Sequence, residues 1–221
     1  MALGFKMNGG GAGGGNADII PIVKYDARAG RLARRDYENG EYVNNDISRN
    51  FRAVADLENI EQGWIDFNTG HAPDFCVDHN SKPFPNQPST NHKQGFRMLM
   101  KLGKECGGDI REMAGNSQAI LRGIDQLHDE YVKGVIDNPG KLPVITLSDT
   151  VPVTSGEGSK KSTNYVPVFE IVSWVGRPPD LVYKPKAQSM SRPATGSAPM
   201  TGSRQVSPPS SPAPASDDDF G

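Results

Sequence analysis

The sequence predicts a mainly β protein with a single helix, flanked by two segments that are too poor in apolar side chains to fold. Alternation of apolar and polar residues recurs along the middle of the 221-residue chain, while helical spacing of apolar residues occurs once. Several strands, one helix and a final pair of strands are typical of a five-stranded Greek-key barrel of the OB type, with its helix between strands 3 and 4. An α+β sandwich has the same element order and is the structural alternative.

The strand signals are runs of β-branched and aromatic residues bounded by turn formers. They cover residues 19–25, 51–57, 62–68, 95–102, 142–147 with a continuation toward Val153, and 165–175. Residues 69–94 are rich in Pro, Asn, His and Ser, which predicts a long loop. The strands on either side of that loop would form most of the sheet.

The helix is expected to begin after Ser117, a residue type that caps helix N-termini. The apolar residues that follow fall on one helical face and are Ile120, Ile124, Leu127 and Tyr131. The helix ends before Asn138-Pro139-Gly140, because proline and glycine do not continue a helix.

Both ends of the chain are expected to be flexible. Residues 1–17 form a Gly-rich leader, and residues 184–221 contain seven Pro and eight Ser but few large apolar side chains. Such segments bury too little surface to offset their loss of conformational entropy on ordering. The predicted folded domain is therefore 18–183.

The charge is unevenly distributed along the chain. Asp217, Asp218 and Asp219 contribute −3 to the net charge of −2, which leaves +1 on residues 1–216. The sequence contains no run of 18 apolar residues and no apolar stretch near its start, so neither a membrane span nor secretion is indicated and a cytoplasmic location is expected.

No catalytic motif is apparent, and we expect no enzymatic activity, metal or cofactor. The side chains that could bind zinc lack the paired spacing of a zinc site; they are His71, Cys76, His79, His92 and Cys106. A hydrolase or nuclease whose ligands converge only in three dimensions remains the third alternative below.

Clusters of basic and aromatic residues favour binding of single-stranded nucleic acid, because cations contact phosphates and aromatic rings stack on unpaired bases. The first cluster lies near the N-terminus and contains Lys24, Tyr25, Arg28, Arg31, Arg34, Arg35 and Tyr37. Further candidates of the same two types are Trp64, Phe67, Lys93, Phe96, Arg97, Lys101, Lys160, Lys161 and Tyr165. The competing interpretation places the aromatic residues in the core and the cations on a solvated sheet edge.

The C-terminal tip, Ser216-Asp217-Asp218-Asp219-Phe220, has the features of a peptide ligand. Its carboxylates would contact a basic patch on a partner and Phe220 would fill a pocket, while the linker supplies reach.

This tip, together with the segments Lys93-Gln94-Gly95-Phe96 and 165–175, resembles the single-stranded DNA-binding proteins of bacteria and bacteriophages. The resemblance implies sequence-independent coating of single strands during replication, recombination or repair, in the cytoplasm of a bacterial host. It also implies that Asp217, Asp218, Asp219 and Phe220 recruit a polymerase, helicase or nuclease and compete with DNA for the body. The tip departs from the bacterial Ile-Pro-Phe ending, because Gly221 follows Phe220.

Two other classes of function remain open. A protein–protein adaptor or phage structural subunit would use the same barrel and tail without binding nucleic acid, and a metal-dependent hydrolase would use ligands not recognised above. Self-association is compatible with each of them.

Overall fold

The computed structural model describes residues 20–68 and 72–186, and all of them belong to one compact unit. The predicted leader and the acidic tip lie outside the described residues. Within the described ranges, no helix combines the length and hydrophobicity that a membrane span requires.

The described chain is mainly β with one α-helix, which confirms the predicted class. Its strands number ten, and they are β1 (Ile22–Asp26), β2 (Arg31–Glu38), β3 (Glu41–Asp46), β4 (Arg52–Ala55), β5 (Glu61–Asp66), β6 (Asp74–His79), β7 (Lys93–Leu102), β8 (Ile110–Gly115), β9 (Lys141–Ser155) and β10 (Ser162–Gly176). The helix α1 (Gln118–Gly134) lies between β8 and β9. Three short 3₁₀ turns occupy Leu57–Asn59, Lys104–Cys106 and Gly158–Lys160.

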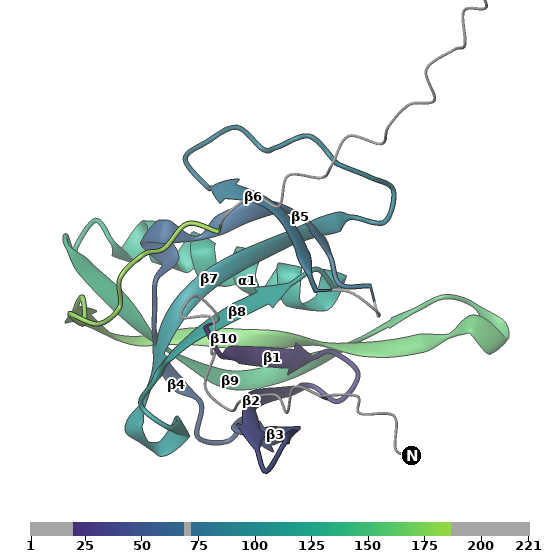
Figure 1. Cartoon of the computed structure of the whole chain (residues 1–221), viewed down its shortest axis with the longest axis horizontal. Helices are drawn as coiled ribbons and strands as arrows, with labels where there is room; N and C mark the ends of the chain where they lie inside the picture. The colour runs from purple at the N-terminus through teal and green to yellow at the C-terminus, as the bar shows by residue number, and fades with distance from the viewer. Residues whose placement is uncertain (1–19, 69–71, 187–221) are drawn as a thin grey trace, which may run out of the picture. The chain divides into compact units, whose positions relative to one another are not determined.

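The strands form one curled, open sheet rather than the five-stranded barrel expected from the sequence (Figure 1). The order is β10-β9-β4-β7-β8-β1-β2-β3, and β5 pairs with both β7 and β6. All pairs are antiparallel except β1 with β8. The additional strands β2, β3 and β8 lack a clear apolar alternation, so periodicity alone does not reveal them. The strand β6 does alternate, with Phe75 and Val77 buried, and it lies within residues 69–94, so the prediction of one long loop there is wrong for this part.

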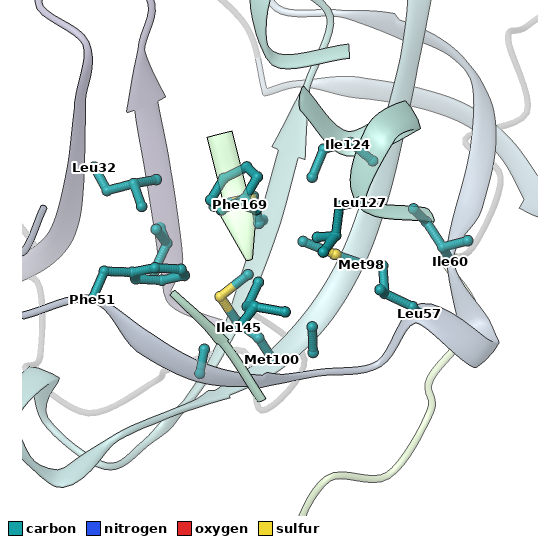
Figure 2. Packing of buried hydrophobic residues seen from close by; sticks show 14 of the residues in the cluster. Leu32, Phe51, Leu57, Ile60, Met98, Met100, Ile124, Leu127, Ile145 and Phe169 are labelled. Carbon is teal, nitrogen blue, oxygen red and sulfur yellow. The ribbon is translucent and has the colours of Figure 1, made fainter. Parts of the chain in front are cut away.

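The helix α1 packs against one face of the curled sheet. Its predicted apolar residues are all buried, and the Ser117 hydroxyl accepts a hydrogen bond from the Ile120 N–H at 3.5 Å, as the sequence predicts. In Figure 2, Ile124 and Leu127 pack towards Met98 of β7. This cluster is the main hydrophobic core, and it continues to Phe169 of β10.

The opposite face of β7 is covered by residues 177–186, which we call the strap. Leu181 of the strap is fully buried against Leu99 of β7 and Leu142 of β9. The Lys184 carbonyl accepts a hydrogen bond from Arg97, so residues 184–186, assigned above to the linker, also lie against the body. As a result β7 is buried on both faces.

Close contact between α1 and β10 depends on Gly123, because a Cβ at this position would lie 2.5 Å from the Pro167 carbonyl oxygen. Alanine normally favours a helix over glycine by about 1 kcal/mol. We nevertheless expect Gly123→Ala to lower the free energy of unfolding by about 1–3 kcal/mol, because backbone has to move. Urea denaturation measures the change, with the exposed Gln126→Ala as control; a more stable Gly123→Ala protein would contradict the prediction.

Candidate nucleic-acid interface

The β2–β3 hairpin presents two tyrosine rings to solvent. Asn39 and Gly40 form its two-residue turn with φ values of 52° and 91°, a left-handed conformation that these two residue types adopt readily. The turn places Tyr37 directly opposite Tyr42, and their ring centroids are 5.0 Å apart in an edge-on arrangement. The two residues are 67% and 64% exposed, so both rings are accessible to a ligand.

A cation lies over one of these rings. The guanidinium carbon of Arg35 is 4.3 Å from the centroid of Tyr42, a cation–π contact. Arg35 pairs with Asn44 and Tyr37 with Tyr42, so these side chains share one face of the sheet. We call Arg35, Tyr37 and Tyr42 the tyrosine platform.

Lys24 of β1 extends the basic character of the same face. Lys24 is exposed and pairs with Ala33, which lies on the side of β2 that carries Arg35. Arg28 is exposed in the turn between β1 and β2. In the part of the chain that the structure describes, neither Lys24 nor Arg28 forms an ion pair, which leaves both available to phosphates.

Two of the predicted DNA-binding arginines are instead neutralised by carboxylates. The alternation of β2 turns Arg34 to the opposite face, where it donates hydrogen bonds to Asp36 at 2.7 Å and to the Cys106 carbonyl. Arg31 pairs with Asp46 of β3 at 2.6 Å. Of the five predicted cations of this cluster, Arg34 thus lies on the face opposite Arg35, and a phosphate would have to compete with a carboxylate at both Arg31 and Arg34.

Asp36 is the centre of a polar network behind the platform. Burial raises the pKa of Asp36, but hydrogen bonds from Asn45, Arg111 and Arg34 outweigh that effect and hold the pKa below its usual value. Arg111 also donates to the Arg35 carbonyl at 2.8 Å. The network thus fixes the backbone from which the Arg35 side chain extends.

Tyr25 and Tyr165 connect the β1–β2 turn to the long β9–β10 hairpin. The Tyr25 hydroxyl donates to the Tyr165 carbonyl at 2.9 Å, and the Tyr165 N–H donates to the Ala27 carbonyl at 2.7 Å. Burial, with the nearby Asp26 carboxylate, raises the pKa of Tyr25 to about 12. These contacts assign both half-buried tyrosines a role in holding the sheet together.

The predicted cluster on β7 does not form a binding surface. Phe96 is 3% exposed and belongs to the core. Arg97, also 3% exposed, forms ion pairs with Glu61 at 2.6 Å and Glu112 at 2.8 Å. The prediction was wrong for these two residues, because β7 is a central strand with α1 on one face and the strap on the other.

The other two predicted residues of β7, Lys93 and Lys101, lie near the ends of the strand. Lys101 is only partly exposed, and its ammonium group contacts the Asp180 carboxylate of the strap at 2.6 Å. Lys93, in contrast, is exposed and forms no ion pair within the described residues. Of the four candidates on this strand, the structure leaves one free to contact nucleic acid.

The other predicted residues are distributed over separate parts of the surface. The Trp64 indole N–H donates to the Pro85 carbonyl at 2.8 Å, and Phe67 is 40% exposed with its ring edge-on to Phe75. Lys160 and Lys161 are exposed at the tip of the β9–β10 hairpin, which extends beyond the rest of the sheet in Figure 1. None of these residues is part of the tyrosine platform.

Comparison with protein-family models, curated proteins and solved structures finds no match to this chain. The geometry of the described residues is therefore the basis for a functional assignment. Within these residues, no group of three or more His, Cys, Asp or Glu side chains is arranged to hold a metal ion.

Tyr42 is the residue of the platform that sequence reasoning missed. Its signal was the Asn39-Gly40 pair, which is the strongest short-range indication of a two-residue hairpin turn. Residues at equal distances from a two-residue turn pair across the hairpin, so Tyr37 pairs with Tyr42 and both rings lie on one face.

Proposed function

We propose that this protein binds single-stranded DNA without sequence preference and uses the tyrosine platform to stack on unpaired bases. The observation that carries the proposal is the exposed Tyr37–Tyr42 pair with Arg35 over one ring. Every base has an aromatic face, so stacking on a tyrosine is tolerant of sequence and contributes about 1–3 kcal/mol per base. Lys24, on the same face of the sheet, and Arg28, in the turn at the opposite end of β2, supply positive charge for phosphates along a bound strand.

The ion pairs of Arg31 and Arg34 imply that stacking contributes more to binding than phosphate contacts do. With Lys24, Arg28 and Arg35 as the contributing cations, three phosphates would be neutralised. For single strands the slope of log K against log salt is about −0.7 for each neutralised phosphate, which gives about −2. We therefore expect a shallow dependence of binding on salt.

Fluorescence anisotropy of labelled oligo-dT at several salt concentrations tests the function. We expect saturable binding, a slope near −2, and much weaker binding of a duplex of equal length, since paired bases are not available for stacking. Equal affinity for the duplex would contradict the proposal. Absence of binding to either would favour the protein–protein adaptor.

The tail adds a second element to the proposal. The acidic tip, with Asp217, Asp218, Asp219 and Phe220, would recruit a replication, recombination or repair protein while the body holds the strand. The support for this role is the sequence of the tip and its similarity to the tails of single-stranded DNA-binding proteins.

A further inference from the structure

A cleft of about 380 Å³ with a mixed polar and apolar lining lies between α1, the strands β5 and β7, and the loop that follows β6. Small-molecule sites commonly have volumes of roughly 300–1,000 Å³, so this cleft is of a size for a small ligand. It is separate from the tyrosine platform, since none of its lining residues belongs to β1, β2 or β3.

Four side-chain amides line this cleft: Gln62 of β5, Asn80 after β6, Gln94 of β7 and Gln118 of α1. The Asn80 amide nitrogen lies 3.3 Å from Nε2 of His128, which also lines the cleft. None of the three glutamine side chains makes a hydrogen bond within the residues that the structure describes, so their polar atoms are available to a ligand. Each amide offers donors and an acceptor side by side. The edges of nucleobases carry the complementary groups, and glutamine pairs with them in this way.

An aromatic side chain, that of Phe84, lies at the rim of the cleft. Phe84, in the loop after β6, is 43% exposed and lines the cleft, and its ring meets the Trp64 ring edge-on at 5.8 Å. Phe96 contributes a buried apolar wall. An accessible aromatic side chain beside hydrogen-bonding amides is the combination that recognises a planar, polar ring.

The charged side chains that line the cleft limit the charge of a ligand that can bind there. Arg122 and Asp125 both line it, one helical turn apart on α1, and their formal charges cancel. A nucleoside triphosphate would meet too little positive charge here, whereas one phosphate can be bound by Arg122 alone. The Asp125 carboxylate can accept hydrogen bonds from a sugar hydroxyl or an exocyclic amino group.

We propose that this cleft binds one nucleoside monophosphate unit, with the glutamine amides on the base edge, Phe84 against the ring and Arg122 on the phosphate. The unit can be a free nucleotide or one nucleotide of a bound strand, and only the second source rests on the function proposed above.

Isothermal titration of the full chain with dAMP, dCMP, dGMP and dTMP separately tests the site. We expect at least one of them to bind, and Gln94→Ala and Arg122→Ala each to weaken that binding at least tenfold. The matched control is Gln126→Ala, a glutamine exposed on α1 outside the cleft. Circular dichroism confirms that each variant is folded.

Failure of all four nucleotides to bind at millimolar concentration would overturn the proposal, as would unchanged binding by both cleft variants. Phe84→Ala gives an independent check, because Phe84 is exposed and its removal leaves the core intact. It should also weaken nucleotide binding, and an unchanged affinity would count against stacking in the cleft.

Binding of a homo-oligonucleotide of the base whose monophosphate binds most tightly identifies the source of the nucleotide. Weaker binding of that oligonucleotide by Gln94→Ala, together with competition by the monophosphate, would show that the cleft holds a nucleotide of the strand. Monophosphate binding with unchanged affinity for that oligonucleotide would show that the ligand is a free nucleotide. Absence of nucleotide binding in the cleft would not contradict single-stranded DNA binding by the tyrosine platform, so the two proposals are tested independently.

Discussion

Replacement of Arg97 by methionine is expected to lower the free energy of unfolding by about 3–5 kcal/mol. The guanidinium is buried and pairs with Glu61 and Glu112, which are themselves 1% and 5% exposed. The substitution would leave two carboxylates buried without their main partner, and breaking one side of a buried ion pair costs about this much. The reason for the large effect is the charge left behind rather than the strength of the original pair.

Urea denaturation measures this change, and Lys101→Met is the matched control. Lys101 lies on the same face of β7, but its contact with Asp180 is partly exposed to water, so its loss should leave stability almost unchanged. Equal stability of the two variants would contradict the assignment of Arg97 to a buried ion-pair network.

Arg97 also holds the strap, so its loss should expose residues 177–186 to proteolysis. Its guanidinium donates to the Lys184 carbonyl at 3.0 Å, and Glu61 in turn accepts hydrogen bonds from the Tyr183 hydroxyl and the Lys186 N–H. Under native conditions trypsin should therefore cleave after Lys186 faster in Arg97→Met than in the unmodified protein, whereas Lys184 is not a site because Pro185 follows it. Cleavage at the same rate would show that the strap is held by its apolar contacts.

Removal of both rings of the platform, by Tyr37→Ala with Tyr42→Ala, is expected to reduce oligo-dT affinity more than any other exposed pair of substitutions. Each stacked base contributes about 1–3 kcal/mol, so each single substitution should weaken binding roughly 5- to 150-fold. The cost to folding should be small, because an exposed cross-strand pair contributes about 0.2–1 kcal/mol. Anisotropy titrations with oligo-dT measure the change in affinity.

Phenylalanine substitutions at the same two positions are the control. Tyr37→Phe with Tyr42→Phe keeps the rings and removes the hydroxyl groups, so binding should remain close to that of the unmodified protein. Full oligo-dT affinity in the alanine variant would exclude the platform as the stacking surface. An equal loss in both variants would point to hydrogen bonding by the hydroxyls instead.

Elements with a strong apolar period were predictable. The helix after Ser117 lies where the periodicity places it, because burial of one face imposes the spacing of its apolar residues. The strands that contain 95–102 and 165–175 also lie where their runs of apolar residues predict strands. Strand β3 has no buried residue, and β8 buries Arg111 and Glu112 beside a single core residue, Met113. Backbone pairing defines such strands more than an apolar period does, so the pattern of apolar residues does not reveal them.

The candidate site was predictable in its type and in part of its membership. The basic and aromatic cluster at the N-terminal end of the body contains Arg35 and Tyr37, and both lie on the platform. Sequence could not separate Arg35 from Arg34 or from Arg97, since the three differ in which face of a strand they occupy and in which carboxylate lies opposite.

The sequence by itself determined a mainly β body with one amphipathic helix, and the residue types that a single strand of DNA would require. Only the tertiary structure decided which of those residues meet. Arg97 and Glu61 are 36 positions apart and become partners through the pairing of β5 with β7. The physical reason is that strand register sets the neighbours of each side chain, and register depends on contacts between distant segments that a local pattern does not encode.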